Sequence, residues 1–301
     1  MARIARKGRD GALYIGYREE DGGILIPDER MKGPAGSTRT GDIVGHEFRS
    51  EILGDERIIM VYRPPGYSPM NPWRYPVLYL NDGQNMFDAA TSAFGVEWQV
   101  DETLERLISE RAIQPILAVA VYNSAERFDE YTPAPDPEHG GGGADRYGMF
   151  LANELQPFIN REYRTNTDQT ALMGSSLGGL CSLYLGWQYP RCFNLVAALS
   201  PSLWWAGREL TRAIAESPRT CDDGPEKIWL DMGTKEDKDD DLIADIRALR
   251  KVLVSKGYVV GENLFYREVK GAYHTESSWA KRVGDVLQAL FPPGRGYFTA
   301  D

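Results

Sequence analysis

The sequence is poor in the residues that would tie it to a membrane or to an oxidising compartment. It has three cysteines in 301 residues, and three cannot all pair within one chain. The N-terminal segment is charged throughout and lacks the apolar stretch of a signal peptide, so we expect reduced thiols and a cytoplasmic location. The longest apolar run, residues 116–121, is far too short to cross a bilayer.

Positive charge is also scarce. Lysine and arginine total 34 against 44 aspartates and glutamates, which gives a net charge of −10. Phosphate and anionic lipid repel such a protein, so we expect neither nucleic acid nor a membrane as a partner. The 42% of hydrophobic residues is enough to bury a sizeable core.

The hydrophobic pattern predicts an α/β fold. Residues 46–53 and 57–63 alternate like strands, and Gly54-Asp55 between them predicts a hairpin turn. Continuous apolar runs at 76–80 and 116–121 are typical of buried parallel strands. Further strands are predicted at 170–173, 194–200, 227–231 and 264–269, and helices at 100–111, 149–163, 177–188, 207–216, 241–257 and 277–291. This order predicts a mostly parallel sheet with an antiparallel N-terminal hairpin and helices on both faces.

Two segments stand outside this alternation. Residues 1–45 are polar and glycine-rich, so we expect an irregular N-terminal extension with short strand pieces around Ala12–Tyr17. Such an extension leaves open a homo-oligomer formed through it, and residues 46–301 would then form a single domain. The stretch PAPDPEHGGGGADRYG, residues 133–148, predicts a flexible loop of the kind that shapes sites in α/β enzymes.

The stretch TALMGSSLGGL contains a G-x-S-x-G motif centred on Ser176. In a nucleophile elbow a buried strand precedes the serine and a helix follows it, and glycines two residues away on each side permit the sharp turn. Residues 170–173 and 177–188 supply that strand and helix. We therefore predict that Ser176 is a nucleophile rather than an ordinary loop serine.

A serine nucleophile needs a base, and the chain contains only His46, His139 and His274. In α/β-hydrolases the triad runs serine, acid, histidine along the chain, and only His274 follows Ser176. His274 also comes just after the last predicted strand, at the carboxyl edge of the sheet where catalytic residues of open parallel sheets collect. We predict that His274 is the base.

The acid is drawn from the run that follows residues 227–231. We expect Asp231 to lie within the strand, and Asp239–Asp241 to cap the next helix and complement its dipole. Glu236 and Asp237 remain as alternatives. The run lacks the glycine and terminal glutamate of an EF-hand, so no metal is expected there, and no cofactor is expected at all.

Two backbone N–H groups are predicted to form an oxyanion hole. The N–H of Leu177, directly after the nucleophile, is one of them. The segment YLNDGQNMFD follows a predicted strand, and Gly83 would let its backbone turn toward the site. We expect the N–H of Gln84 to be the second donor, although N-D-G also fits a plain tight turn.

Taken together, these motifs resemble the putative-esterase family of α/β-hydrolases, which includes enterochelin, feruloyl and acetylxylan esterases, S-formylglutathione hydrolase and the mycolyltransferases. The resemblance spans roughly residues 46–292 and rests on several quoted segments: VYRPPGY, PVLYLNDGQNMFD, ERFDEYTP, FLANELQPFINREYRT, MGSSLGGL, ALSPSLWW, GTKE and YHTESSWAKR. It implies an α/β-hydrolase catalytic domain over 46–301. It also implies an acid three residues after Gly233, which favours Glu236 over Asp237, and it favours Gln84 as the second oxyanion donor.

In this fold Trp204 and Trp205 would follow a strand end, either as an aromatic wall for an acyl or aryl group or as packing within the core, and His139 would overhang the same mouth. The predicted function is a serine esterase acting on a small-molecule ester. An acyltransferase with the same triad, in which an alcohol replaces water, is the first alternative. A non-catalytic binding protein on the same fold is the second.

Overall fold

The computed structural model describes residues 2–7, 13–18, 23–25, 36–237 and 241–294. Its strands are β1 (Ala2–Lys7), β2 (Leu13–Arg18), β3 (Gly23–Leu25), β4 (Asp42–Ser50), β5 (Asp55–Arg63), β6 (Tyr75–Leu80), β7 (Leu117–Val121), β8 (Thr165–Ser175), β9 (Leu195–Leu199), β10 (Lys227–Gly233) and β11 (Leu264–Val269). Its helices are α2 (Val100–Ser109), α3 (Arg127–Glu130), α4 (Ala144–Phe150), α5 (Gln156–Glu162), α6 (Leu177–Gln188), α7 (Trp205–Glu216), α8 (Asp241–Ser255) and α9 (Glu276–Leu290), with short 3₁₀ and π segments η1 (Gly83–Asn85) and η2 (Leu151–Leu155).

All described strands join one sheet, in the order β1-β2-β3-β4-β5-β7-β6-β8-β9-β10-β11. The β4–β5 hairpin is antiparallel, turns at Gly54 with a φ of +77°, and pairs antiparallel with β7. From β7 to β11 every pairing is parallel. The predicted mostly parallel sheet with an antiparallel N-terminal hairpin is therefore confirmed. β1, β2 and β3 lie within the predicted N-terminal extension, and β4 begins at Asp42, before the boundary expected at residue 46.

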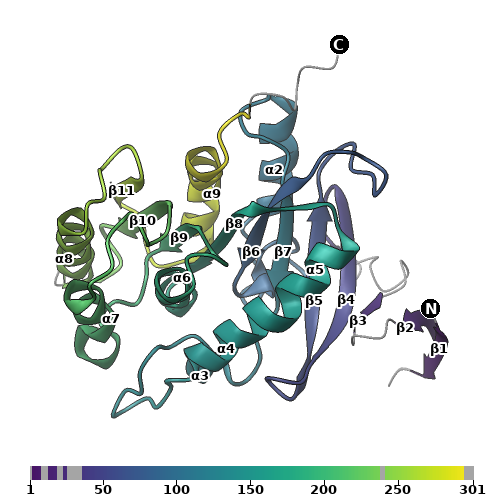
Figure 1. Cartoon of the computed structure of the whole chain (residues 1–301), viewed down its shortest axis with the longest axis horizontal. Coiled ribbons are helices and arrows are strands. Elements are labelled where there is room, and N and C mark those ends of the chain that lie inside the picture. Colours follow the sequence, from purple (N-terminus) through teal and green to yellow (C-terminus); the bar gives the residue numbers. More distant parts are fainter. Residues whose placement is uncertain (1, 8–12, 19–22, 26–35, 238–240, 295–301) are drawn as a thin grey trace.

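Helices cover the two faces of the sheet with separate cores (Figure 1). On one face, side chains of α2 and α9 such as Leu104 and Val283 pack against the sheet. On the other face, α4 to α8 contribute side chains such as Phe150, Leu180 and Leu249. The strands between these two layers are buried on both sides, which accounts for the continuous apolar runs of β6 and β7.

The strand order creates a switch point at β6. The chain leaves β6 toward β7 on one side, and β8 pairs with β6 on the other side. Loops that follow two such strands diverge, and the crevice between them is where open α/β sheets bind ligands. The segment after β6 carries Asp82 and Gln84, and the residue after β8 is Ser176. The topology thus brings the predicted oxyanion loop to the predicted nucleophile.

Candidate active site

Ser176 occupies a strained turn between β8 and α6. Its backbone angles, a φ of +55° and a ψ of −123°, lie in a region that residues other than glycine rarely adopt. A Cβ on Gly174 would lie 2.6 Å from the backbone of Gly178, and a Cβ on Gly178 would lie 3.2 Å from Asn81. Glycine is therefore needed at 174 for the strand and the helix to approach this closely, position 178 is tightly packed, and the geometry is that of a nucleophile elbow.

Glu236 and His274 are in direct contact. Oε2 of Glu236 lies 2.7 Å from Nδ1 of His274, and its Oε1 accepts hydrogen bonds from the Ser200 hydroxyl and the Gly233 N–H, both at 2.6 Å. Burial alone would raise the pKa of Glu236, but these hydrogen bonds, led by that of His274, outweigh burial and lower it. Glu236 is therefore a buried, ionised carboxylate that fixes the orientation of the His274 ring.

The other acidic candidates serve the structure. Oδ2 of Asp237 accepts the backbone N–H of Leu242 at 2.8 Å and so caps the first turn of α8. Asp231 lies in β10 as expected, fully buried, with its Oδ1 2.5 Å from the Arg282 guanidinium. Asp241 begins α8, and the predicted capping residues Asp239 and Asp240 lie outside the described residues. Of the two acids that spacing left open, Glu236 is the one that contacts His274.

Ser176 and His274 share a cavity of about 720 Å³ at the carboxyl edge of the sheet. Its lining residues are Asp82, Gln84, Asn85, Ala93, Phe94, Val96, Asn123, Arg127, Ser175, Ser176, His274, Thr275, Glu276, Ser277 and Trp279. In the described part of the chain, Ser176 Oγ lies 3.2 Å from the hydroxyl of Ser202 and is not hydrogen bonded to His274. Such a bond is often long in a ligand-free site and shortens when substrate binds.

The two predicted oxyanion donors lie in the first turns of two helical segments beside this cavity. Leu177 is the first residue of α6, and Gln84 is the second residue of η1. N–H groups in a first helical turn have no partner within the helix and can face a ligand. A Cβ on Gly83 would come within 2.6 Å of the Ala120 and Val121 backbone, so glycine alone lets η1 lie this close to β7.

An ion pair holds the start of this loop. Arg127 binds Asp82 through two nitrogens, with Nε 2.6 Å from Oδ1 and Nη2 2.7 Å from Oδ2. Asn123 donates to the same Oδ1 at 2.6 Å, and the Asp82 N–H donates to the buried Tyr131 hydroxyl. These bonds fix Asp82 in a left-handed conformation, directly before Gly83 and Gln84. Asp82 and Arg127 both line the cavity, so its guanidinium is already paired with a carboxylate.

The aromatic residues predicted to wall the site lie together beside it. His139 packs against both tryptophans, with ring centroids 6.1 Å from Trp204 and 5.9 Å from Trp205. Trp205 is buried and donates its indole N–H to Ala134, whereas Trp204 is 39% exposed. None of the three lines the cavity that holds Ser176; Phe94, Val96 and Trp279 supply its apolar wall.

A buried polar network beneath the Glu236–His274 pair was not predicted from the sequence. Ser200 donates to Glu236 and accepts hydrogen bonds from Trp279 and Arg282. Arg282 lies on the buried face of α9 and also binds Asp231. One feature of the sequence could have indicated this network. Arg282 stands among the apolar positions of an amphipathic helix, and an arginine buried in this way requires a carboxylate partner.

Comparison with known proteins places the chain in a family. The model of the family described as "Putative esterase" matches residues 50–289. The chain belongs to this esterase family. Ferri-bacillibactin esterase BesA of Bacillus subtilis is 28% identical to this chain over 190 residues. The match covers 56% of this chain and 63% of BesA.

Two solved structures share the fold of the esterase. An IroE-like serine hydrolase from Shewanella oneidensis aligns with a TM-score of 0.67 at 21% identity, over 83% of this chain and 80% of that one. The enterobactin esterase FES from Shigella flexneri aligns with a TM-score of 0.64 at 19% identity, over 95% of this chain and 68% of that one. The esterase therefore has the α/β-hydrolase fold. Among its described residues, no helix combines the length and the apolar character needed to cross a membrane.

Proposed function

We propose that the protein is a serine carboxylic-ester hydrolase that works through an acyl-enzyme on Ser176. The observation that carries the proposal is the convergence of a strained serine at an elbow and a carboxylate-bound histidine on one cavity. A histidine oriented by a carboxylate beside a serine is the arrangement that raises the nucleophilicity of a hydroxyl at neutral pH.

The chemistry follows from the two ring nitrogens of His274. Because Nδ1 faces Glu236, Nε2 is the nitrogen available to accept the proton of the Ser176 hydroxyl. Ser176 Oγ then attacks the ester carbonyl, and the resulting oxyanion accepts hydrogen bonds from the N–H groups of Leu177 and Gln84. The imidazolium returns its proton to the leaving alcohol. Water repeats the sequence on the acyl-enzyme and releases the acid.

The substrate class is inferred from the cavity and from a relative. A cavity of about 720 Å³ with Phe94, Val96 and Trp279 on its apolar side suits an acyl or aryl group of drug-like size. BesA is named as a ferri-bacillibactin esterase, and a relative from Emericella nidulans is named as a siderophore enterobactin esterase, so siderophore esters are the first natural class to test, with a catecholate siderophore as the first member. Methyl ferulate and p-nitrophenyl acetate, butyrate and octanoate complete the substrate panel.

The nucleophile is tested by substituting two neighbouring serines, one at a time, and comparing the activities of the two variants. Ser176→Ala should lower kcat for p-nitrophenyl acetate by about 10³-fold or more, and the residual rate should come from binding and the oxyanion hole. Ser175→Ala changes a serine that also lines the cavity, so it controls for altered packing and should retain most activity. A fluorophosphonate should label the wild type and Ser175→Ala but leave Ser176→Ala unlabelled. Labelling that persists in Ser176→Ala would refute the assignment.

A further inference from the structure

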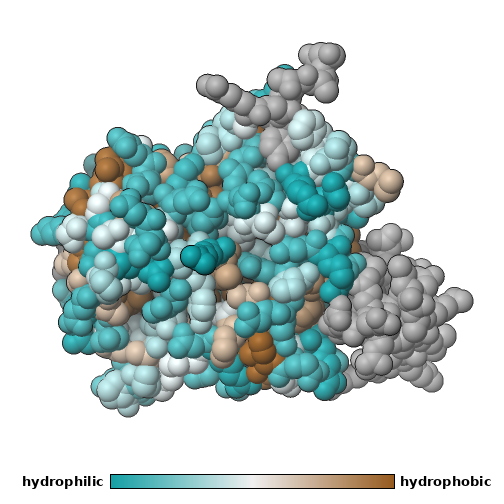
Figure 2. Space-filling view, viewed as in Figure 1, coloured by the Kyte–Doolittle hydropathy of each residue, from teal (hydrophilic) through white to brown (hydrophobic). Residues whose placement is uncertain are grey.

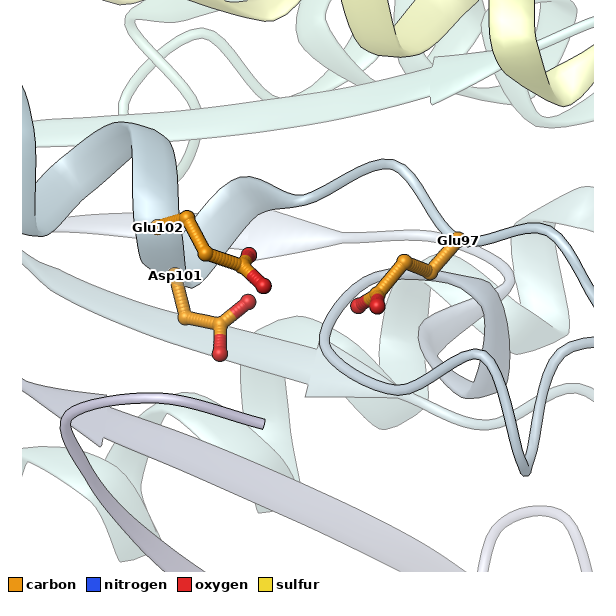
Figure 3. Close-up of side chains that lie close together, drawn as sticks. All are labelled: Glu97, Asp101 and Glu102. Atoms are coloured by element: carbon orange, nitrogen blue, oxygen red, sulfur yellow. The ribbon is translucent and has the colours of Figure 1, made fainter. Parts of the chain in front are cut away.

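Three acidic side chains converge at the start of α2, away from the Ser176 cavity. Glu97 precedes the helix, and Asp101 and Glu102 lie in its first turn. One carboxylate oxygen of each lies within 4.8 Å of the others. Figure 3 shows the Asp101 and Glu102 carboxylates side by side, with that of Glu97 turned toward them from the preceding loop.

Neighbouring groups satisfy only part of this cluster. The Thr38 hydroxyl donates to Oε1 of Glu97, and the Thr40 N–H donates to Oδ2 of Asp101 at 2.6 Å. The positive end of the α2 dipole favours acids in this turn, where the Asp101 N–H also faces its own carboxylate. Oε2 of Glu97, Oδ1 of Asp101 and Oε2 of Glu102 are buried and receive no hydrogen bond from an N–H or hydroxyl donor among the described residues, while the Asp101 and Glu102 carboxyls lie within hydrogen-bond reach of one another.

Burial of these oxygens destabilises the folded protein, because no solvent compensates their charge. Asp101 is 0% exposed and Glu97 is 5% exposed. A buried carboxylate without a partner is among the least favourable groups in a protein, and like charges a few ångströms apart add repulsion. A positive charge that contacts all three side chains at once would therefore be strongly favourable at this position.

We propose that Glu97, Asp101 and Glu102 bind a hard divalent cation of the Ca²⁺ or Mg²⁺ type. The donors in the cluster are all carboxylate oxygens, which these cations prefer, and it holds no histidine or cysteine that would select a softer metal. Oxygens on opposite sides of a Ca²⁺ ion are about 4.8 Å apart, given a Ca–O distance of about 2.4 Å, so the spread of these ligand atoms suits one ion. Water would supply the remaining ligands.

The position of this site gives the cation a structural role. Glu97 lies in the segment between η1 and α2 that also carries Phe94 and Val96 of the cavity wall. The next residue, Trp98, packs against Trp279 with ring centroids 5.7 Å apart, and Trp279 packs against His274. A cation held by Glu97 and by α2 would fix this segment against the sheet and so stabilise one wall of the cavity.

The experiment measures the melting temperature of the full chain after treatment with EDTA and dialysis. Addition of Ca²⁺, Mg²⁺ or Mn²⁺ to about 1 mM should raise Tm by roughly 3–6 °C for at least one ion, because a ligand that binds only the folded state stabilises it by mass action. Isothermal titration calorimetry of the same protein should give a stoichiometry near one for that ion. Comparing the three ions shows which radius fits the site.

The variant Glu102→Gln removes one ligand charge at the half-buried member of the cluster. It should melt at or above the temperature of the EDTA-treated wild type, because a repulsion is relieved, and it should lose the response to the cation. Glu105→Gln is the matched control, since Glu105 lies one turn along α2 and can still accept the Tyr62 hydroxyl as glutamine. It should respond like the wild type. If none of the three ions shifts Tm of the wild type, or if Glu102→Gln responds equally, the proposal is wrong and the carboxyls share a proton instead.

Discussion

Three donors converge on one carboxylate at the centre of the site. Glu236 accepts from His274, Ser200 and Gly233, and its side chain is fully buried. Its pKa is lowered overall, so it stays ionised throughout the neutral range. A carboxylate held in this way can keep the histidine in one tautomer and stabilise the imidazolium that forms during attack.

Loss of this charge should affect turnover and leave binding nearly unchanged. We expect Glu236→Gln, which keeps the volume, to lower kcat by about 10²- to 10⁴-fold with little change in KM, or ~3–5 kcal/mol of transition-state stabilisation. Steady-state kinetics with p-nitrophenyl acetate measures both constants.

Asp237→Asn is the matched control, because asparagine can still cap α8 through the Leu242 N–H. It should change kcat by less than about tenfold. If Asp237→Asn abolishes activity and Glu236→Gln does not, the roles of the two acids are reversed.

The sequence points to chemically distinctive residues more readily than to those that support them. Ser176 and His274 follow from a motif and from the scarcity of histidine. Spacing alone could not choose between Glu236 and Asp237, because both follow the same strand. The structure distinguishes them by contact, because Glu236 reaches His274 whereas Asp237 caps α8. A Cβ on Gly233 would lie 2.4 Å from the Ala272 carbonyl oxygen, so this position accommodates only glycine. Ser200 was not predicted, since nothing local marks a serine that bridges β9, the acid loop and α9.

At the scale of elements, the glycine run in residues 133–148, where the sequence predicts a flexible loop, adopts a series of left-handed backbone conformations; its mobility stays a prediction. Gly140, Gly141 and Gly142 have φ values of +72°, +88° and +101°. The Gly142 N–H donates to Thr132, and Asp136 and Gly140 form a β-bridge. These glycines are needed because the loop turns through conformations that other residues adopt only at a cost.

Alanine substitutions at two neighbouring glycines distinguish the cost of backbone strain from the cost of steric crowding. A Cβ on Gly140 meets nothing within 4 Å, whereas one on Gly141 would lie 2.3 Å from Thr132 Oγ1 and 2.9 Å from Trp205. We expect Gly140→Ala to lower the free energy of unfolding by about 1 kcal/mol, and Gly141→Ala by about 2–4 kcal/mol. Urea denaturation measures both. Equal losses would show that the loop is free to move away from Trp205.

His46 joins strand β4 to the end of α5. Its Nε2 lies 2.6 Å from the Tyr163 hydroxyl, and its ring packs edge-on against Phe158. Burial, and secondarily the charge of Arg63, lowers the pKa of His46 to about 4. In the unfolded chain a histidine titrates near 6.5. Between these two values the unfolded chain binds a proton that the folded protein does not, so stability is present above pH 6.5 and is lost as pH falls toward 4.

This difference predicts a pH dependence specific to His46. Between pH 7 and pH 5, wild type should lose about 2 kcal/mol more unfolding free energy than His46→Gln, at ~1.4 kcal/mol for each unit of pKa difference. Glutamine can still hydrogen bond to Tyr163, and other titrating groups contribute equally to both proteins. Urea denaturation at the two pH values gives the comparison, and parallel losses would mean that His46 is protonated in the folded state.

Hydrophobic patterns gave the type and order of these elements but not their details. The predicted helix 149–163 is interrupted by the π-helical η2, just before Pro157 in the first turn of α5, where the missing N–H and the ring disturb regular α-helical bonding. The strand predicted at 170–173 extends over Thr165–Ser175, because its polar first half pairs with β6 across a shift in register. Polar residues at the end of a strand do not show the alternation of apolar and polar positions from which a strand is predicted.

At the scale of the whole molecule, local patterns do not specify which strands are neighbours. The antiparallel hairpin and the alternation of strands with helices were visible in the sequence, but the crossover that places β6 between β7 and β8 was not predicted. That crossover is what brings Asp82, Gln84 and Ser176 together. The site therefore depends on contacts between residues about ninety positions apart, which only the assembled sheet provides.

The net charge of the molecule bears on the kind of substrate it accepts. The chain carries a net charge of −10, and the face in Figure 2 is mainly hydrophilic, with hydrophobic residues in small separate patches. Within the cavity, Arg127 is neutralised by Asp82, and Glu276 adds a further negative charge. An anionic substrate, such as a ferric catecholate complex, therefore meets a repulsive field both at long range and at the site.

The effect of this repulsive field on catalysis can be measured as the dependence of kcat/KM on salt concentration. Raising NaCl from about 20 to about 200 mM shortens the screening length from roughly 20 Å to below 10 Å, so the approach of an anion becomes easier. We expect kcat/KM for an anionic catecholate siderophore to rise several-fold over this range. The value for p-nitrophenyl acetate, which is neutral, should change less than about twofold and controls for effects of salt on the enzyme itself. A fall in kcat/KM for the anion would mean that the substrate meets a positive surface. In that case the Arg127–Asp82 pair would have to open in the complex, and Arg127 would become the first residue to substitute.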